Sequence, residues 1–313
     1  MKTYFVTGAS GFIGSCMVRR LVKEKECVHI LLRSQANVWR IRDILNAVTV
    51  HIADFSSEKK LIDIIKRVRP SIIYHFAAYG AYPHQQDGRR AIKTNIEGTW
   101  NLLKATEKYD YELFVNTGSS SEYGFKDKPM KETDMLEPAS YYATTKAAQT
   151  LMCTYEARKL NKPIVTIRPF SVYGPYEEPT RFMPQLMNCL YTQKTMKLVD
   201  PLIARDFIYI DDILDAYMTI ARLQKYPGEV FNIGSGIQST LETVVQNAFK
   251  ITNVSTVCDW GSMPKRIWDA TTWVADISKS KKFLQWKPQT NLAKGLLLFW
   301  RWYKNNHLLY SHA

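Results

Sequence analysis

A short glycine-rich segment near the start of the chain limits the fold more than any other feature. Tyr4–Thr7 reads as a strand, Gly8–Gly14 follows it, and a helical pattern of apolar residues begins directly afterwards. A strand, a glycine-rich turn and a helix in succession form the dinucleotide-binding geometry, with the pyrophosphate on the N–H groups of the helix N-terminus. Gly8 allows the tight turn, Gly11 lets the backbone approach the pyrophosphate, and Gly14 lets the helix pack closely on the strand. The segment therefore predicts nucleotide binding.

Further strands alternate with helical segments along the first half of the chain. Apolar runs at residues 27–32, 48–52, 71–76, 113–117 and 163–167 are predicted strands. Helical periodicity runs over residues 89–108 and from Ser140, an expected N-cap, to about Leu160. Strands and helices that alternate at this spacing form a parallel, doubly wound sheet. The predicted fold class is therefore α/β, with a Rossmann doubly wound parallel sheet.

The character of the sequence changes after residue 170, where aromatic-rich and Pro-punctuated segments mix with short helices. We therefore expect a dinucleotide-binding domain at residues 1–170, to which a strand–helix unit at residues 206–232 returns. Residues 171–205 and 233–313 are expected to form a smaller, discontinuous C-terminal substrate domain. The ligand crevice is expected between the two domains.

Composition argues against several other classes of protein. The 313 residues are 46% hydrophobic and 23% charged, which is ordinary for a globular chain. No apolar run approaches the ~20 residues of a membrane helix, and no signal peptide is expected before the first strand. The five cysteines are scattered without CxxC spacing, and the six histidines form no ligand-spaced pairs. We therefore expect a cytoplasmic protein with reduced thiols, no membrane contact and no metal site.

The net charge of +13 raises the question of an anionic partner. Nucleic acid is not expected, because the Lys and Arg residues are spread along the chain with no basic block. A positive cleft would also favour a phosphate-bearing nucleotide. The charge therefore fits a small anionic ligand or an ordinary solvated surface.

The end of the second predicted strand bears on the choice of cofactor. An acidic residue that binds the adenosine ribose 2′-OH is expected about 20 residues past the glycines. Arg33 stands there instead, with Arg40 downstream. An arginine suits a 2′-phosphate because its planar fork pairs bidentately with phosphate oxygens, so NADP is favoured over NAD. Asp54, at the end of the third strand, is placed to reach the adenine amino group or to cap the helix that begins near Ser57.

Two Tyr-x-x-x-Lys pairs compete for one catalytic role on the same predicted helix. Tyr142/Lys146 and Tyr155/Lys159 each place a phenol and an ammonium on one helix face. A lysine charge favours the phenolate, which can exchange a proton with a sugar oxygen while hydride moves to or from the carbon. Because a helix turns about 100° and rises about 1.5 Å per residue, the tyrosines lie about 220° and ~20 Å apart. Tyr142, next to the C-terminal sheet edge where ligands bind, is predicted to be catalytic, and Tyr155/Lys159 a solvated face.

Ser119 follows the fifth predicted strand at the same edge of the sheet. A hydroxyl there can hydrogen-bond the reacting oxygen and orient it beside Tyr142. Serines after a strand are more often turn formers, so this prediction depends on the Tyr/Lys helix beside it. Ser120 is the alternative for the role.

Together, these motifs resemble those of the extended short-chain dehydrogenase/reductase family of nucleotide-sugar epimerases, dehydratases and ketoreductases. The resemblance fades after about Asp276, and the segments that carry it are Thr7–Gly14, His75–Ala78, Asn95–Thr99, Ser119, Tyr142, Lys146, Arg168–Pro175 and Arg205–Asp212. It implies a nucleotide diphosphate sugar as substrate, and a homodimer formed through helices that include the Tyr142 helix. It also makes the second domain the one that binds the nucleotide sugar.

The resemblance also implies roles for individual residues. Ser119, Tyr142 and Lys146 would be catalytic, and Asn95 would help to order the cofactor and the active-site helices. Arg205 would bind the substrate diphosphate, which Arg266 matches more loosely. The predicted cofactor-binding residues are Gly8, Ser10, Gly11, Phe12, Ile13, Gly14, Arg33, Asp54, Phe55, Ala77, Ala78, Asn95, Thr117, Tyr142, Lys146 and Pro169. The predicted substrate-binding residues are Ser119, Ser120, Ser171, Arg205 and Arg266.

The residues after Ser119 bear on the reaction. The resemblance implies that dehydratases of this family carry an acid–base carboxylate pair directly after the catalytic hydroxyl, or a glutamate two residues after it. Here Ser120 and Ser121 fill those places, and Glu122 comes one residue late. Dehydration needs a base and an acid at the sugar, so it is disfavoured unless a local deletion shifts Glu122.

We therefore expect an NADP-dependent reductase of a nucleotide-linked 4-keto(-6-deoxy)sugar, with hydride transfer at sugar C4 and Tyr142 as the acid. The alternative is an NAD-dependent nucleotide-sugar 4-epimerase that uses the same residues. A non-catalytic NADP-sensing protein is a further alternative, but it would have no use for the intact set of Ser119, Tyr142 and Lys146.

Overall fold

The computed structural model describes residues 2–82, 84–264 and 269–312. By its internal contacts the chain divides into two compact units. The first unit comprises Met1–Gly124, Met135–Arg168 and Tyr217–Phe231, and the second Phe125–Asp134, Pro169–Ala216 and Asn232–Ala313. Two details differ from the expected domain boundaries. Phe125–Asp134 lies in the second unit, and the chain returns to the first unit at Tyr217 rather than at residue 206.

A parallel sheet of seven strands, in the order β10-β6-β5-β4-β1-β2-β3, is the largest sheet of the described chain. Its strands are β1 (Thr3–Thr7), β2 (Cys27–Leu32), β3 (Thr49–Ile52), β4 (Ile72–His75), β5 (Leu113–Thr117), β6 (Ile164–Pro169) and β10 (Val230–Ile233). The first six confirm the predicted strands to within two residues, whereas β10 was not expected from its sequence. The Rossmann-like α/β fold class is therefore confirmed. The strand order reverses between β1 and β4, and ligands of such sheets bind at the carboxyl ends of the strands at this point.

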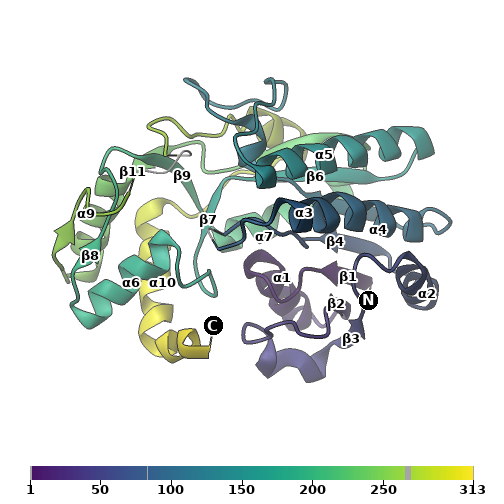
Figure 1. Cartoon of the computed structure of the whole chain (residues 1–313), viewed down its shortest axis with the longest axis horizontal. Coiled ribbons are helices and arrows are strands. Elements are labelled where there is room, and N and C mark those ends of the chain that lie inside the picture. Colours follow the sequence, from purple (N-terminus) through teal and green to yellow (C-terminus); the bar gives the residue numbers. More distant parts are fainter. Residues whose placement is uncertain (1, 83, 265–268, 313) are drawn as a thin grey trace. The chain divides into compact units, whose positions relative to one another are not determined.

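Helices α2 (Glu58–Val68), α4 (Gly98–Thr106) and α5 (Tyr141–Leu160) lie side by side along the sheet, as Figure 1 shows. Helix α1 (Phe12–Lys23) packs against β1 and β2. The helix expected at residues 89–108 is divided into α3 (Gly88–Ala91), a π-helical turn η2 (Ile92–Glu97) and α4. π-helical turns inside helices are frequent at functional sites, and this one contains the buried Asn95.

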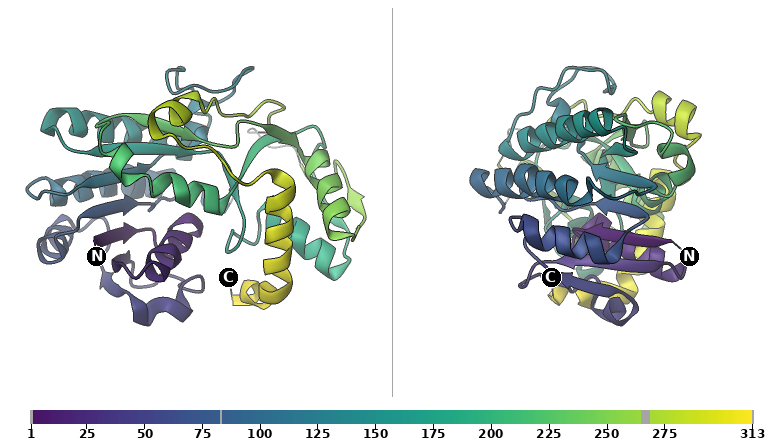
Figure 2. Two further views of the ribbon diagram at one scale, coloured as in Figure 1. Left: turned by 180° about the vertical axis from the view of Figure 1, so that it is seen from behind. Right: turned by 90° about the vertical axis from the view of Figure 1, so that its right-hand side faces the viewer.

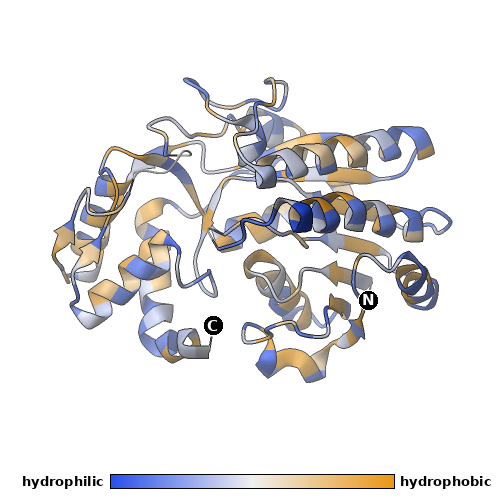
Figure 3. Ribbon diagram, viewed as in Figure 1, coloured by the Kyte–Doolittle hydropathy of each residue, from blue (hydrophilic) through white to orange (hydrophobic). Residues whose placement is uncertain are grey.

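The core of the first unit forms between the sheet and helices α2, α4 and α5. Phe5, Ile73 and Phe114 come from three adjacent strands and belong to one buried cluster with apolar residues of those helices. Side chains alternate along a strand, so the neighbours of these residues point to the opposite face of the sheet. Helix α2 is amphipathic, because Leu61 and Ile64 are buried while charged residues occupy its other side. Figure 3 shows both hydrophobic (orange) and hydrophilic (blue) residues along this helix.

The second unit contains two small sheets. One has the order β11-β9-β7, from β7 (Ser171–Tyr173), β9 (Ala204–Tyr209) and β11 (Gln238–Thr240), and the other pairs β8 (Met196–Lys197) with β12 (Cys258–Asp259). Its helices are α6 (Phe182–Thr192), α9 (Leu241–Thr252) and α10 (Leu292–Asn306). Helix α10, drawn in yellow in Figure 2, packs on α6 and α9. The short helical segments of this unit include η4 (Ser280–Leu284) and η5 (His307–His312), whereas α8 (Ile220–Leu223) and η1 (Arg42–Ala47) belong to the first unit.

Strand β9 corrects the expectation that residues 206–216 return to the large sheet. It pairs antiparallel with β11 and parallel with β7, and α7 (Ile210–Tyr217) follows it directly. A strand followed by a helix has the same local pattern in either sheet, so the partner strands decide which sheet it joins. The five cysteines all lie in the described part and form no disulfide. Among the described helices, none is long and apolar enough to span a bilayer.

Candidate active site

The glycine loop closes tightly on the end of β4. Gly8 has a positive φ of +68°, and a Cβ on it would lie 2.5 Å from the backbone nitrogen of Ala77. A Cβ on Gly14 would lie 2.2 Å from the carbonyl oxygen of Gly8, so any larger residue would push α1 away from β1. Gly11 is the N-cap of α1 and makes no side-chain cap hydrogen bond. The first N–H groups of α1 therefore suit a phosphate, and this closely packed backbone fits a dinucleotide.

Two arginines occupy the region after β2. Arg33 is exposed, whereas Arg40 is buried and donates from Nη1 to the carbonyl oxygen of Ser10 at 3.2 Å. Arg40 is itself held, because its guanidinium lies 4.3 Å over the Trp39 ring and its carbonyl oxygen accepts two hydrogen bonds from Arg19. The sequence reasoning noted Arg40 but did not connect it with Ser10. The structure therefore puts a cation directly on the glycine loop.

The predicted adenine-side residues have mixed environments. The Asp54 carboxylate accepts hydrogen bonds from the N–H (2.8 Å) and the hydroxyl (2.6 Å) of Ser56. These bonds lower the pKa of Asp54, and Arg33 contributes to the same shift. Asp54 does not cap α2, because the N-cap is Ser57. The Phe55 side chain belongs to the core, and Ala77 is buried while Ala78 is exposed. Whether Asp54 and Phe55 contact a cofactor stays a prediction.

A buried histidine links the ends of β1 and β4. Thr7 Oγ1 lies 2.7 Å from His75 Nδ1, and His75 Nε2 lies 2.8 Å from Thr99 Oγ1. The Thr99 hydroxyl donates to the carbonyl oxygen of Asn95 at 2.7 Å, so it must accept from His75 Nε2–H. His75 is therefore the neutral Nε2–H tautomer, and burial lowers its pKa to about 3.

Asn95 continues this network to the start of α5. Its Oδ1 accepts from the Tyr79 N–H at 2.8 Å, and its Nδ2 donates at 2.8 Å to the Tyr79 carbonyl oxygen and to Thr145 Oγ1. The Thr145 hydroxyl donates to the carbonyl oxygen of Tyr142 at 2.9 Å. Asn95 thus links Tyr79 to the first turns of α5, and its role in ordering the cofactor stays a prediction.

Ser119 is fixed by the short helix η3 (Ser120–Tyr123) directly after β5. Its Oγ accepts from the Ser121 N–H at 3.1 Å, and its own N–H donates to Glu122 Oε1 at 2.7 Å. These two bonds form a capping box, which satisfies donors at a helix start reciprocally. The alternative residue, Ser120, is also buried.

Lys146 is fully enclosed one helical turn after Tyr142. Ser140 caps α5 by accepting from the Ala143 N–H at 3.1 Å, which places Tyr142 in the first turn. Lys146 Nζ donates to the Thr117 carbonyl oxygen and to Gln149 Oε1. Burial lowers the Lys146 pKa to about 8, opposed by the Glu122 carboxylate. Lys146 thus lies beside the end of β5, two residues before Ser119.

The competing pair on α5 has a different environment. The Tyr155 side chain is 59% exposed, and Lys159 Nζ lies 5.7 Å from the centre of its ring. Lys159 also lies 3.8 Å from Glu156 Oε1. Tyr155/Lys159 is therefore a solvated surface pair, as its position on the helix predicted.

Of the predicted substrate-binding residues in the second unit, the structure describes Arg205 and Ser171. Arg205 lies on β9, donates to the carbonyl oxygens of Ala204 (2.7 Å) and Ala270 (3.2 Å), and forms an ion pair with Asp269 at 3.9 Å. Pro169 is the last residue of β6, and Ser171, two residues later, is the first residue of β7. Arg266 lies outside the described residues. Substrate binding by these residues stays a prediction.

Three buried residues of the site were not predicted to take part in it. Glu122 and Arg168 form an ion pair at 2.7 Å, and both are almost fully buried. Gln149 is buried too and accepts from Lys146. Its spacing of three residues from Lys146 on one helix was the only sequence signal that could have pointed to it.

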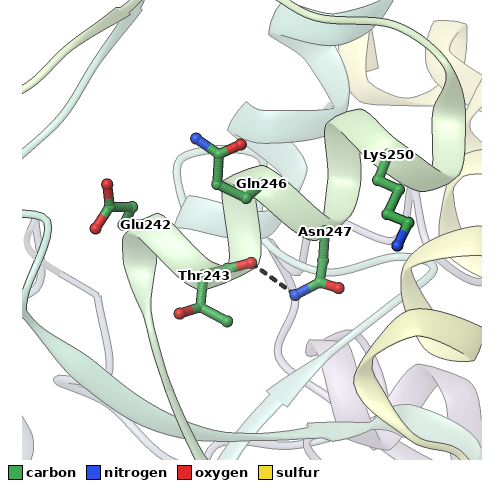
Figure 4. Close-up of a pocket in the computed structure, with 5 residues that line it drawn as sticks. All are labelled: Glu242, Thr243, Gln246, Asn247 and Lys250. Carbon is green, nitrogen blue, oxygen red and sulfur yellow. Dashed lines mark hydrogen bonds between the residues drawn. The ribbon is translucent and has the colours of Figure 1, made fainter.

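A further pocket of the described chain lies outside the predicted site residues. Figure 4 shows a polar groove on α9, lined by residues of that helix alone: Glu242, Thr243, Gln246, Asn247 and Lys250. Asn247 Nδ2 donates to the Thr243 carbonyl oxygen at 2.8 Å across it. None of the predicted site residues lines this groove. Within residues 2–82, 84–264 and 269–312, no group of acidic, His or Cys side chains is arranged to hold a metal ion.

Comparison with known proteins decides the family. The model of the NAD dependent epimerase/dehydratase family matches residues 4–234, which is well over half of the chain. The chain belongs to this family. It is accordingly an enzyme of the nucleotide-sugar epimerase/dehydratase type within the extended short-chain dehydrogenases.

The relatives differ in reaction. The UDP-glucuronate 4-epimerase of Thermodesulfobacterium geofontis is 30% identical, over 98% of this chain and 97% of the relative. The human dTDP-D-glucose 4,6-dehydratase is 26% identical, over 97% and 91% respectively. A solved UDP-glucuronic acid 4-epimerase from Bacillus cereus, in complex with UDP-glucuronic acid and NAD, is 25% identical with a TM-score of 0.84, and the match covers 97% of this chain and 99% of that one. These findings favour the epimerase alternative over the expected reductase, and NAD over NADP.

Proposed function

We propose that this chain is a 4-epimerase of a UDP-linked sugar that uses a retained NAD. The observation that carries the proposal is the placement of Lys146, which is buried in the first turns of α5 after Tyr142 and bonded to the end of β5 just before Ser119. The names of the relatives, a UDP-glucuronate 4-epimerase and a structure with UDP-glucuronic acid and NAD, support this choice of reaction and ligands.

In a reversible oxidation at sugar C4, each site residue would have a separate role. Tyr142 would take the proton of the C4 hydroxyl and later return it. The Ser119 hydroxyl would hydrogen-bond the C4 oxygen, while the Lys146 charge would favour the phenolate and hold the nicotinamide ribose. A bound NAD would supply the reversible hydride acceptor that this oxidation at C4 needs. The glycine loop and the free N–H groups of α1 would hold its pyrophosphate.

Dehydration is disfavoured by the environment of Glu122. This side chain was the remaining candidate for a dehydratase acid, and its two oxygens accept from Ser119, Thr150 and Arg168. Both carboxylate oxygens are thus engaged by protein donors rather than directed at a sugar. Ser120 and Ser121 stand where a dehydratase would need carboxylates.

A second candidate is the NADP-dependent reductase of a nucleotide-linked 4-ketosugar. The observation that favours it is the pair of arginines at the end of β2, with Arg40 bonded to the glycine-loop carbonyl of Ser10. The nearby described carboxylates have other partners, since Asp43 is paired with Arg19 and Asp54 with Ser56. An arginine pair of this kind suits a 2′-phosphate.

One experiment separates the two candidates. The purified protein is denatured, the released nucleotide is identified by mass, and the protein is assayed with UDP-glucuronic acid and with UDP-glucose. For an epimerase we expect about one NAD per chain and a C4-epimeric product without net change in NADH absorbance. Little bound cofactor, with NADPH consumed only when a 4-keto-6-deoxy nucleotide sugar is supplied, would support the reductase instead.

A further inference from the structure

Glu122 bonds the backbone of Ser119, and both of its carboxylate oxygens accept hydrogen bonds. Its Oε1 accepts from the Ser119 N–H at 2.7 Å and from the Thr150 hydroxyl at 3.0 Å. Its Oε2 accepts from Arg168 Nε at 2.8 Å and lies 2.7 Å from Arg168 Nη2 as an ion pair. The carboxylate thus joins β6, α5 and the loop after β5, all within the first unit.

Arg168 is held as firmly as its partner. Its Nη1 donates to the Tyr123 hydroxyl at 2.9 Å, and its guanidinium lies 4.7 Å over the Tyr123 ring. Burial works against the charge of Arg168, but the adjacent Glu122 carboxylate outweighs it and raises the Arg168 pKa. The two charges therefore compensate each other at Glu122 Oε2, while Oε1 is left to bind Ser119 and Thr150.

A buried ion pair is weak evidence for stability, because desolvation can cancel the attraction between its charges. Apolar side chains of similar volume would fill the same space. They would not, however, accept the Ser119 N–H, which is one half of the capping box. The pair therefore makes a contact to the candidate catalytic loop that packing alone cannot supply.

The capping box also sets the direction of the Ser119 hydroxyl. Ser119 Oγ already accepts from the Ser121 N–H at 3.1 Å. Its own hydrogen is left to donate to another acceptor, which is the role the proposed mechanism needs toward the C4 oxygen. A loop released from Glu122 would lose this orientation.

We propose that Glu122, held by Arg168, is a positioning residue that fixes the backbone and hydroxyl of Ser119 for the redox step at C4. This inference rests on the proposed function. It predicts an effect on kcat, because a small misplacement of a catalytic group can cost up to about 100-fold in rate. It predicts little effect on KM, because the Glu122 oxygens bond protein donors and make no proposed contact to a ligand.

The central test is the double variant Glu122→Val/Arg168→Met, which removes both charges together. We expect a soluble protein that retains NAD, with kcat for C4 epimerisation of UDP-glucuronic acid lowered about 10- to 100-fold and KM changed less than about 3-fold. Glu156→Gln is the matched control, since Glu156 is a buried glutamate on α5 whose ion-pair partner is the surface Lys159. Its kcat should stay within about 2-fold of the wild type, as expected of a site outside the network. A wild-type kcat in the double variant would overturn the positioning role.

A cycle with Ser119→Ala shows whether the pair acts through Ser119. If it does, adding Glu122→Val/Arg168→Met to Ser119→Ala should lower kcat by less than about 2-fold further, because the effects of coupled residues are not additive. A full, independent loss in that background would contradict the inference. Arg168→Lys keeps the charge without the fork and should give an intermediate kcat, so it repeats the test if the double variant is insoluble.

The failure of this inference can be told from failure of the proposed function. An active Tyr142→Phe enzyme would remove the proposed function whatever Glu122 does. A wild-type kcat in the double variant, together with an inactive Tyr142→Phe enzyme, would leave the function in place and remove only the positioning role.

Discussion

Helix α5 carries the same four-residue spacing twice, and the two copies have opposite environments. Tyr142 and Lys146 stand at its start, where Lys146 is buried and bonded to the end of β5. Tyr155 and Lys159 stand in its last two turns, where Tyr155 is 59% exposed. The residue types and spacing are identical, so the difference arises from what each turn of the helix faces.

The comparison teaches that a Tyr-x-x-x-Lys motif becomes a site only through burial of its lysine. Around Lys159 water screens the charge, so it can do little to a neighbouring phenol. Around Lys146 the charge acts in a low-dielectric interior and is directed by Thr117 and Gln149. The predictions below test this difference, beginning with the largest effect.

Exchanging each tyrosine for phenylalanine should separate the two pairs most clearly. Tyr142→Phe removes the proton donor and acceptor, and we expect turnover to fall about 10²- to 10⁴-fold. Retained nucleotide, measured by mass after denaturation, should remain near the wild-type amount. Tyr155→Phe is the matched control and should keep turnover within about 2-fold, as surface substitutions usually do. Substantial activity in Tyr142→Phe would exclude the assignment of Tyr142.

Lys146→Met tests the burial of the lysine charge through stability as well as activity. The Lys146 pKa is about 8 in the folded chain against 10.5 for the free side chain, so between these values the unfolded chain binds more protons. The free energy of unfolding of the wild type should therefore increase as pH rises from 8 to 10. The increase is up to ~3 kcal/mol, at about 1.4 kcal/mol per pKa unit. Urea unfolding of nucleotide-free protein at pH 7.5 and 9.5 measures it.

In the Lys146→Met variant this rise should be missing, and turnover should be largely lost. Lys159→Met should keep both the rise and the activity, because its charge is solvated. An identical pH dependence in wild type and Lys146→Met would show that Lys146 is not a buried charge in the nucleotide-free protein.

His75 belongs to the network that holds the Tyr142 end of α5, and no such network was found among the described residues near Tyr155. Its folded pKa of about 3 lies below the unfolded value of 6.5, so it contributes stability that is complete above pH 6.5 and is lost as pH falls toward 3. The slope for one proton is at most about 1.4 kcal/mol per pH unit. His75→Asn should show a shallower loss between pH 6.5 and 5, where most carboxylates are still ionised. If the free energy of unfolding falls equally steeply with pH in both proteins, His75 is protonated in the folded state over this range.

The smallest effect is expected at the cap of α5. Ser140 Oγ accepts from the Ala143 N–H at 3.1 Å, one residue after Tyr142. Ser140→Ala should lower the free energy of unfolding by about 1 kcal/mol, measured by urea titration. Because the cap orders the first turn, kcat should fall several-fold in this variant, whereas Thr240→Ala at the cap of α9 should cost similar stability without affecting kcat. Equal kcat values in both cap variants would show that the fraying of this turn does not reach Tyr142.

Much of the first unit could be predicted from local sequence. The glycine loop, six strands and the span of α5 depend on neighbours within a few residues, such as Gly8 at a positive φ and Ser140 at an N-cap. The rejection of Tyr155 was also predictable, because helix geometry places it away from the start of α5. The choice of NADP rested on Arg33, with Arg40 downstream, whereas the solved relative from Bacillus cereus is a complex with NAD.

What escaped prediction depended on contacts between residues far apart in the chain. β9 has the pattern of a Rossmann strand, but its partners β7 and β11 assign it to another sheet. In the sequence, Glu122 resembles a dehydratase acid that is shifted by one residue. In the structure it binds Arg168, which lies 46 residues later in the chain. The sequence by itself determined the nucleotide-binding fold and the candidate Ser119, Tyr142 and Lys146, because turns, caps and helical spacing are short-range. Only the tertiary structure decided which lysine is buried and what Glu122 binds, because burial and ion pairing are set where distant segments meet.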